Sequence, residues 1–391
     1  MKPLDGVLIA DFSRVLAGPY ATMLLADLGA QVIKVERPGT GDDTRAWGPP
    51  FADSTATYFL GVNRNKQSVA LDFTTPEDAA LARELVRRAD VVVENFLPGT
   101  MDRHGLGYEQ VRELNPAVVY CSITGFGADE GAALPGYDLI VQAVGGLMSV
   151  TGEPGGSGTK VGVALVDVVT GLHAAFGIMA ALRHREQGGS GQHVEVSLLT
   201  SLLSGLCNHS SGYLAAGVVP RALGNAHPSI APYEVYQASD RPIVIAAGND
   251  RQFERLCAAL GAPELAADPR FGDNPERVAH RDELADELNR LLSARDADAW
   301  FTALSAAGVP CGPINDLAEA FALAERLGLG AVAELEDPRR DGPLRQVAHP
   351  IAFSETPATY RSAPPRLDED GTEIRRLLAR YARTAQSRGT R

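Results

Sequence analysis

The first 36 residues constrain the fold more than any other stretch of the chain. Residues 6–12 (GVLIADF) predict a short buried strand, Gly18 and Pro19 begin a helix, and residues 31–36 (QVIKVE) predict a second strand. A strand, a helix and a strand in this order form a βαβ unit, so the sequence predicts an α/β fold with a parallel sheet. The first turn lacks the G-x-G-x-x-G pattern of dinucleotide sites, which argues against NAD. The helix start near Ala17 and Gly18 could still hold a phosphate or a carbonyl group.

After about residue 215 the predicted order of strands and helices differs from the regular alternation of the preceding chain. A Thr75 cap begins one further helix, and residues 90–96 and 117–124 predict further strands. From Tyr233 to about Leu327 the pattern predicts a second, smaller α/β or α+β domain. A Pro-rich run near the C-terminal end is too extended to pack locally, so we expect it to cross back to the first domain. The expected limits are 1–215 with 335–391 for the large domain, 233–327 for the small domain, and 216–232 and 328–334 for the linkers.

Composition excludes several classes of partner. The formal net charge of −13 argues against nucleic acid and anionic membranes, and no run of eighteen apolar residues or signal-peptide pattern is present in the 391 residues. The four cysteines lie far apart without C-x-x-C spacing, which fits a reducing compartment, and we expect a cytoplasmic protein. The eight histidines include no H-E-x-x-H cluster, so a metal site is not expected.

Asp167 is the most informative acidic residue. It lies between residues 161–165 (VGVAL), which read as a strand or a buried approach, and residues 168–185, whose apolar spacing predicts a helix. Asp167 is therefore expected at or just before a helix N-terminus, where the helix dipole favours the ionised carboxylate at neutral pH. The alternative is a plain N-cap. The glycine-rich loop before it and the apolar flanks favour a functional acid, because burying a carboxylate is costly.

Residues 36–51 predict a long irregular loop, and together with residues 57–73 they supply a group of cations. Each cation alone is an ordinary surface charge. As a group on loops at one end of an α/β sheet they suit a polyanionic ligand. The group consists of Arg37, Arg45, Arg64 and Lys66.

Seven segments in chain order resemble the class III CoA-transferases. The small-domain run GNAHPSIAPYEVYQASDRPIVIAAGNDRQF is similar to the succinyl-CoA-dependent members of the succinate–hydroxymethylglutarate or glutarate type. The seven segments are LDGVLIADFSRVLAGPYATMLLADLGAQVIKVERPGTGDDTR, NRNKQSVALDF, VVVENFLPGTMDRHGLGYEQ, YCSITGFG, GYDLIVQAVGGLMSVTGE, VALVDVVTGLHA and VPCGPIND.

The resemblance implies a fold, an assembly and a reaction. The fold is a Rossmann-like large domain with an inserted smaller α/β domain, and the assembly is an interlocked homodimer. The reaction moves CoA from an acyl-CoA to a small carboxylic acid through an aspartyl-CoA thioester, with Asp167 as the nucleophile and no permanently bound cofactor. By position, the resemblance assigns CoA contacts to Leu16, Ala17, Arg37, Leu71, Asp72, Phe73, Thr74, Asn95, Phe96, Leu97, Arg103 and Tyr137.

The remaining expectations concern the oxyanion and the acceptor acid. Each tetrahedral intermediate needs N–H donors, and the turns at residues 17–18 and 247–249 are the candidates. A dicarboxylate acceptor needs a cation or several donors for its distal carboxylate. Arg45 and His227 are the candidates, with Gly248 and Asn249 as further substrate contacts. For His227 the alternative is a loop histidine bonded to the backbone.

Three departures from the family pattern narrow the reaction. Leu16 stands where some members carry Gln, and only AAGN (residues 246–249) is present in place of the multi-glycine loop of the formate–oxalate members. Tyr137 stands where the racemases of the family use a His base. A tyrosine is a poor base at neutral pH, which disfavours racemisation. A 2-methylacyl-CoA racemase or epimerase is therefore the alternative function and not the main one.

Overall fold

The computed structural model describes the backbone of residues 1–389 and the side chains of residues 1–381. The chain packs as two compact units. The first contains Met1–Leu147, Val161–Val218 and the chain from Gly330 onward, and the second contains Met148–Lys160 and Val219–Leu329. The domain limits expected from the sequence stay a prediction, and the structure groups residues 148–160 with the second unit.

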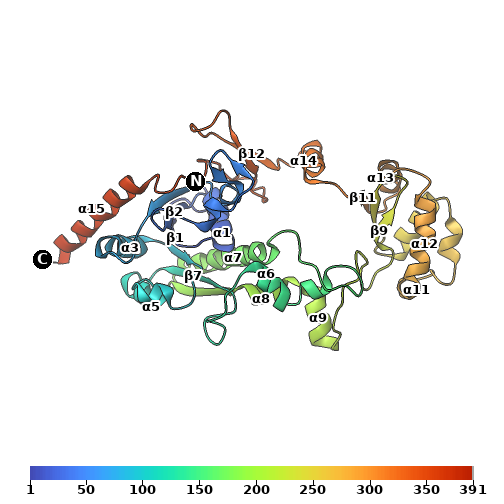
Figure 1. Ribbon diagram of the computed structural model, residues 1–391, viewed down its shortest axis with the longest axis horizontal. Coiled ribbons are helices and arrows are strands. Elements are labelled where there is room, and N and C mark those ends of the chain that lie inside the picture. The colour runs from blue at the N-terminus through green and yellow to red at the C-terminus, as the bar shows by residue number, and fades with distance from the viewer. Residues whose placement is uncertain (390–391) are drawn as a thin grey trace. The chain divides into compact units, whose positions relative to one another are not determined.

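The first unit is built on a six-stranded parallel sheet (Figure 1). The strands in spatial order are β5 (Lys66–Ala70), β2 (Gln31–Glu36), β1 (Leu8–Asp11), β6 (Val91–Glu94), β7 (Val119–Thr124) and β8 (Gln192–Ser197). This is the doubly wound order, in which the chain direction across the sheet reverses between β1 and β6. The predicted parallel α/β fold is confirmed, and β5 is a strand that the sequence patterns did not predict.

One face of the sheet is covered by α1 (Ala17–Asp27) and α7 (Leu165–Glu186). The two helices approach closely at Gly171, where an added Cβ would stand 2.6 Å from the carbonyl oxygen of Ala17. By length and composition alone, α7 could also cross a membrane, a test that core helices of soluble proteins pass as well. The residues that precede α7 do not form the expected strand, and Val163 among them is exposed.

The other face carries α3 (Pro76–Arg88), α5 (Tyr108–Leu114) and α15 (Gly371–Gly389). The predicted cap is present, since the Thr75 side chain accepts a hydrogen bond from the N–H of Asp78. Ile374 and Leu378 of α15 belong to the same buried cluster as the strands and α3. The C-terminal element therefore completes the core of the first unit.

The chain leading to α15 runs along the first unit. It begins with the hairpin of β12 (Val332–Leu335) and β13 (Leu344–Val347). The N–H of Asn65 donates to the carbonyl of Ser362 (3.0 Å), and the Asn65 side chain donates to the carbonyl of Thr359 (2.7 Å). The extended run thus packs on the first unit, as we predicted.

The second unit has an antiparallel sheet of β11 (Cys311–Pro313), β10 (Pro242–Ala246) and β9 (Tyr233–Gln237). Its helices are α10 (Asp250–Ala259), α11 (Asn274–Ala279), α12 (Arg281–Leu292), α13 (Ala297–Ala306) and α14 (Leu317–Arg326). Segregated helices on an antiparallel sheet make this unit α+β, which corrects the smaller α/β domain that the resemblance implied.

The first unit also contains several shorter elements. They are β3 (Phe51–Ala52), β4 (Thr55–Ala56), α2 (Thr57–Leu60), α4 (Thr100–Arg103), α6 (Asp138–Val144), α8 (Leu198–Gly205) and α9 (Cys207–Ala216). Short 3-10 helices occupy Asp43–Ala46 in the first unit, and Met148–Val150 and Pro263–Ala267 in the second.

Candidate active site

A cavity of about 430 Å³ lies at the carboxyl ends of β1, β2, β5 and β6, where the strand order reverses. Ligands of doubly wound folds bind at this position. Six of the residues assigned to CoA by resemblance line it: Arg37, Leu71, Asp72, Phe73, Thr74 and Phe96. The structure therefore brings together half of the CoA contacts expected from the sequence.

The walls of this cavity combine aromatic rings and cations. The Phe73 ring lies 5.8 Å from the Phe12 ring and 5.6 Å from the His104 ring, centroid to centroid. Arg14 and Arg37 both reach Asp43, at 2.9 Å and 3.4 Å. Flat apolar walls beside two guanidinium groups suit a nucleotide, whose base stacks and whose phosphates accept charged hydrogen bonds.

Sequence reasoning missed Phe12, Arg14 and His104. Phe12 and Arg14 follow β1 directly, so the rule that placed the ligand at the strand ends was a sufficient signal for both. The Arg14 guanidinium lies 5.2 Å from the Phe96 ring centroid, and its Nε is buried without a hydrogen-bond partner among the described residues. The Arg14 guanidinium therefore keeps an unsatisfied N–H donor at the edge of the cavity.

Asp167 lies in the first turn of α7, at the third helical residue. The N-cap is Ala164, so the alternative that Asp167 is a plain N-cap is wrong. Burial and the neighbouring charge of Asp138 raise the pKa of the Asp167 carboxyl to about 7. This corrects the expectation that the helix dipole leaves Asp167 fully ionised at neutral pH, because desolvation outweighs the dipole here.

Asp138 of α6 caps the N-terminal end of α7. Its Oδ1 accepts hydrogen bonds from the backbone N–H groups of Val166 (2.8 Å) and Asp167 (3.2 Å), and its Oδ2 accepts one from Gln142 (2.7 Å). Sequence reasoning missed Asp138, although it directly follows Tyr137 in a segment that carries the resemblance. A carboxylate at this end of the helix stabilises α7 and raises the cost of a second negative charge on Asp167.

Tyr58 of α2 lies within electrostatic range of both Asp167 and the cavity residue Asp42. Burial, followed by the charges of Asp167, Asp138 and Asp42, raises the pKa of the Tyr58 hydroxyl to about 12. Asp42 lines the cavity described above. The proposed nucleophile and the cavity therefore lie at the same end of the sheet.

The turn between β1 and α1 contains Leu16 and Ala17. The contact between the Ala17 carbonyl and Gly171 places this turn beside α7, one helical turn beyond Asp167. Asn95 holds the turn from the end of β6, because its amide accepts from the N–H of Arg14 (2.8 Å) and donates to the Arg14 carbonyl (2.7 Å). The Asn95 side chain thus supports the turn.

Three of the four cations expected to meet a polyanion are engaged inside the first unit. Arg64 pairs with Asp27, and Lys66 pairs with Asp11, with both cations buried. Arg45 binds both oxygens of Glu36 (2.8 and 2.7 Å) and stacks 3.7 Å from the Phe59 ring centroid.

The Arg45 Nη1 also donates to the carbonyl of Pro365 (3.2 Å). Each nitrogen of Arg45 has a protein acceptor, so the structure gives this residue a packing role in place of the expected contact with a distal carboxylate. Of the four cations, Arg37 is the one that lines the cavity.

The other CoA contacts assigned by resemblance lie outside this cavity. Leu97 is 58% exposed and borders a separate cavity of about 240 Å³. Arg103 is exposed and donates to the Thr100 hydroxyl (3.0 Å). Tyr137 is 61% exposed and directly precedes Asp138, so it lies at the α7 end of the site.

The expected acceptor contacts His227, Gly248 and Asn249 belong to the second unit. His227 Nδ1 accepts from the N–H of Ser229 (3.1 Å), which is the backbone-bonded alternative. The N–H of Gly248 donates to the Gln252 side chain (2.8 Å), and the Asn249 side chain caps α10. Among the described side chains of residues 1–381, no three His, Cys, Asp or Glu residues gather as metal ligands.

Known proteins resemble this chain over nearly its whole length. A family model for CoA-transferase family III matches residues 4–371. A succinate–glutarate CoA-transferase of Agrobacterium fabrum is 44% identical, with 98% of this chain and 97% of that protein covered. An acetyl-CoA:oxalate CoA-transferase of Acetobacter aceti is 42% identical, with 96% of each chain covered.

A solved structure agrees with these sequence relationships. The crystal structure of a CAIB/BAIF family protein from Brucella suis superimposes with a TM-score of 0.85 at 43% identity, covering 96% of this chain and 99% of that chain. At this coverage the match extends through both units. The chain belongs to CoA-transferase family III and is a CoA-transferase.

Proposed function

We propose that the protein transfers CoA from succinyl-CoA to a small dicarboxylic acid, with Asp167 as the nucleophile. The observation that carries this proposal is the position of Asp167, a half-buried carboxyl in the first turn of α7 with a pKa of about 7. The 44% identity to a protein named succinate–glutarate CoA-transferase supports the choice of donor and acceptor class. The separate similarity to an acetyl-CoA:oxalate enzyme leaves the identity of the acid to experiment.

The cavity at the switch point supports the binding of the CoA nucleotide. Its aromatic walls suit the adenine ring, and Arg14 and Arg37 suit the phosphates. The pantetheine arm then reaches from this cavity toward Asp167 past the turn that contains Leu16 and Ala17. The carboxamide that some members place at Leu16 is absent from this chain, so backbone N–H groups at this helix start are the donors available to the oxyanion.

The reaction consists of four balanced acyl exchanges. The Asp167 carboxylate attacks the thioester carbonyl of succinyl-CoA, and the C–S bond breaks to give a mixed anhydride and CoA thiolate. The thiolate attacks the aspartyl carbonyl and releases succinate, which leaves an aspartyl-CoA thioester. The acceptor carboxylate attacks this thioester and releases CoA thiolate, which then attacks the acceptor carbonyl of the second anhydride. The product is the acceptor acyl-CoA, and the Asp167 carboxylate is restored.

Partial burial explains how a carboxylate can act as the nucleophile. In water a carboxylate is a poor nucleophile because its charge is well solvated. Burial removes part of that solvation, and the pKa of about 7 reports the resulting increase in basicity. A pKa near neutrality leaves a substantial fraction of Asp167 ionised at neutral pH, so the reactive form is present.

We further propose a homodimer in which a second copy covers the exposed face of α7. Three apolar side chains of this helix are exposed to solvent in the single chain: Leu172 (45%), Phe176 (76%) and Met179 (36%). An apolar surface of this kind on a helix favours association. The interlocked arrangement, the two-domain division, the absence of a permanent cofactor and a cytoplasmic location are further parts of this proposal.

The test is an exchange assay. The protein is incubated with succinyl-CoA and a panel of carboxylic acids, glutarate first, and new CoA thioesters are identified by mass spectrometry. Asp167→Asn, which preserves size and removes the nucleophile, is expected to abolish exchange. Incubation with the donor alone is expected to give a protein whose intact mass contains covalently bound CoA. If no acid exchanges and α-deuterium instead enters a branched acyl-CoA, the transfer proposal is wrong.

A further inference from the structure

The turn between β1 and α1 adopts an unusual backbone. Val15 has φ of +69°, a left-handed conformation that β-branched residues rarely adopt. Such a conformation persists only where the surroundings hold it. The neighbouring contacts of Val15 therefore identify the residues that determine where Leu16 and Ala17 lie.

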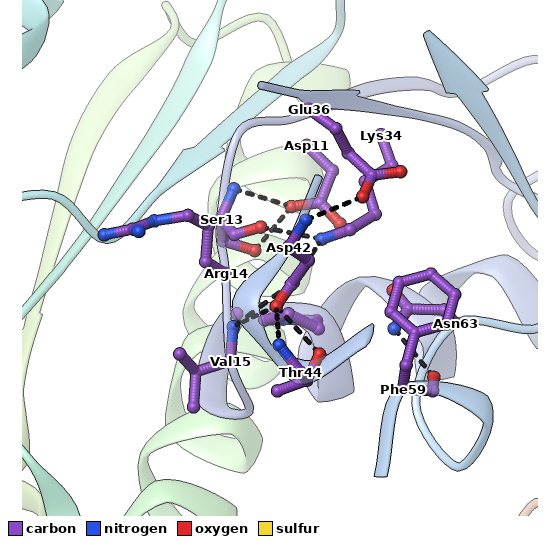
Figure 2. Close-up of polar contacts among 12 residues, drawn as sticks. Asp11, Ser13, Arg14, Val15, Lys34, Glu36, Asp42, Thr44, Phe59 and Asn63 are labelled. Atoms are coloured by element: carbon purple, nitrogen blue, oxygen red, sulfur yellow. Dashed lines mark hydrogen bonds and ion pairs between the residues drawn. The ribbon is translucent and has the colours of Figure 1, made fainter. Parts of the chain in front are cut away.

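Asp42, from the loop after β2, holds Val15 in this conformation (Figure 2). Both carboxylate oxygens lie 3.3 Å from the Val15 nitrogen, and Oδ1 also accepts from the N–H (3.0 Å) and the hydroxyl (2.8 Å) of Thr44. The Asp42 side chain is fully buried. A buried carboxylate with donors on several sides has a fixed orientation, so it is a rigid anchor for the turn.

Lys34 fixes the same turn from the sheet. Its Nζ donates to Asp42 Oδ2 (2.9 Å) and to the carbonyl of Ser13 (2.9 Å), and its side chain is also fully buried. Figure 2 shows the ammonium group between the carboxylate and the Ser13 carbonyl. One ion pair thus contacts the turn at two points, one on each side of Arg14.

The turn transmits this restraint to the helix of the nucleophile. After Leu16 the chain enters α1 at Ala17, and the Ala17 carbonyl lies against Gly171, one turn beyond Asp167 in α7. The charge of Asp42 also acts on Tyr58 together with that of Asp167. A displacement at Val15 therefore changes the geometry between the helix start of α1 and Asp167.

We propose that Asp42 is a positioning residue for the transfer reaction, and that it acts by holding Val15 in the left-handed conformation that places Leu16 and Ala17 beside Asp167. This inference rests on the proposed role of Asp167. Burial opposes ionisation of Asp42, yet Lys34 and the Thr44 donors outweigh it and lower the pKa to about 2. The anchor therefore stays charged throughout the working pH range.

The test compares three variants with the wild type. Asp42→Asn keeps the size of the side chain and removes its charge, and the amide NH2 takes the place of the oxygen that accepts from Lys34 and from the Val15 N–H. Asp42→Asn combined with Val15→Gly restores the turn by another route, because glycine adopts positive φ without strain. Asp27→Asn is the matched control, since Asp27 is a buried carboxylate in an ion pair with Arg64 at the opposite end of α1.

Three measurements decide the outcome: the rate of formation of covalently bound CoA from succinyl-CoA, the Kd of free CoA, and the Val15 φ in a crystal structure. In Asp42→Asn we expect the rate to fall by about 10- to 100-fold and φ to leave the left-handed region. The Kd is expected to change by less than about threefold, because the Asn95 amide still holds the Arg14 N–H and carbonyl. We expect the double variant to recover most of the rate. Asp27→Asn is expected to lower the melting temperature and leave the rate near that of the wild type.

Other results overturn the inference. If Asp42→Asn keeps Val15 at positive φ, or Val15→Gly gives no recovery, then Asp42 does not act through the turn. Equal losses of rate in Asp42→Asn and Asp27→Asn indicate a general effect on stability. A wild type that forms no covalent CoA adduct refutes the proposed function instead, and the Val15 φ in Asp42→Asn still tests the anchor.

Discussion

Asp138 Oδ1 accepts the backbone N–H of Asp167 at 3.2 Å, so two carboxyl groups share the N-terminal end of α7. The first is a cap, and the second is the proposed nucleophile. The negative charge of Asp138 repels a second negative charge on Asp167, and this repulsion adds to burial in raising the pKa of the Asp167 carboxyl to about 7. The two effects can be separated by experiment, because Asp138→Asn removes the charge and retains an oxygen that can accept the same N–H groups.

The first prediction concerns the pH dependence of the donor half-reaction. Attack requires the ionised form of Asp167, so kcat/KM for succinyl-CoA rises with pH and reaches half its maximum near pH 7. In Asp138→Asn the midpoint moves to lower pH, since one of the two causes is removed, and it stays above the ordinary Asp value because burial remains. Glu109→Gln, on exposed α5, serves as the control. An unchanged midpoint in Asp138→Asn refutes the coupling.

The second prediction concerns stability. The folded pKa of Asp167 lies above its ordinary value of 3.8, so the folded state binds more protons and its stability falls as pH rises through both values. In the Asp167→Asn variant this side chain cannot ionise, so the variant does not lose stability in this way as the pH rises. Its advantage in unfolding free energy over the wild type is expected to grow by about 2 kcal/mol from about pH 5 to about pH 8. Urea unfolding at the two pH values measures it, and a constant difference contradicts it.

The third prediction concerns the nucleotide cavity. Arg14→Ala removes a guanidinium that lines the cavity and has a buried Nε without a described partner. We expect CoA to bind about tenfold more weakly, which is the loss of one charged hydrogen bond. Arg112→Ala, on the exposed surface of α5, is the matched control. Calorimetry with CoA measures both, and equal affinities in the two variants exclude Arg14 from the site.

The fourth prediction concerns the contact between α1 and α7. Gly171→Ala places a Cβ 2.6 Å from the Ala17 carbonyl oxygen, and backbone on both sides cannot yield cheaply. The expected result is a loss of about 1–3 kcal/mol of stability together with slower transfer, because the helix of Asp167 is displaced. Gly212→Ala in α9, where nothing lies within 4 Å of the new Cβ, is expected to leave stability and rate close to wild type. A Gly171→Ala variant with wild-type rate shows that the contact does not position Asp167.

The fifth prediction concerns assembly. Phe176→Asp places a charge on the exposed apolar face of α7, and burying it against a second copy carries a large desolvation penalty. The variant is expected to elute as a monomer in size-exclusion chromatography with light scattering, whereas the wild type elutes as a dimer. Arg183→Ser, an exposed position on the same helix, is expected to leave the dimer intact. A dimeric Phe176→Asp places the interface elsewhere.

Local sequence patterns predicted those parts of the fold that depend on neighbouring residues. The first βαβ unit, the Thr75 cap and the helix after Asp167 follow from apolar spacing and capping chemistry. The strand β5 did not, because its first residue is Lys66. That ammonium group is buried only because Asp11 of β1 pairs with it, and 55 residues separate the two. A contact between such distant residues leaves no local pattern.

The same limit applies to the site. The position of Asp167 at a helix start was predictable, whereas its pKa was not, since Asp138 lies 29 residues away and burial depends on the whole fold. The sequence grouped Arg45 with Arg37 because both are cations on one loop. The structure separates them, as Glu36 and Phe59 enclose Arg45. Partners distant in sequence decide which cation faces a ligand.

The path of the C-terminal segment has a consequence for biosynthesis. The hydrophobic cluster beneath β1, β2 and β5 includes Ile374 and Leu378, which are synthesised after the whole second unit. A nascent chain therefore completes its second unit while the sheet that carries the cavity still lacks part of its core. The core of the catalytic unit cannot close until α15 has been made, and a chain released without α15 is a target for quality control even though every proposed site residue is present.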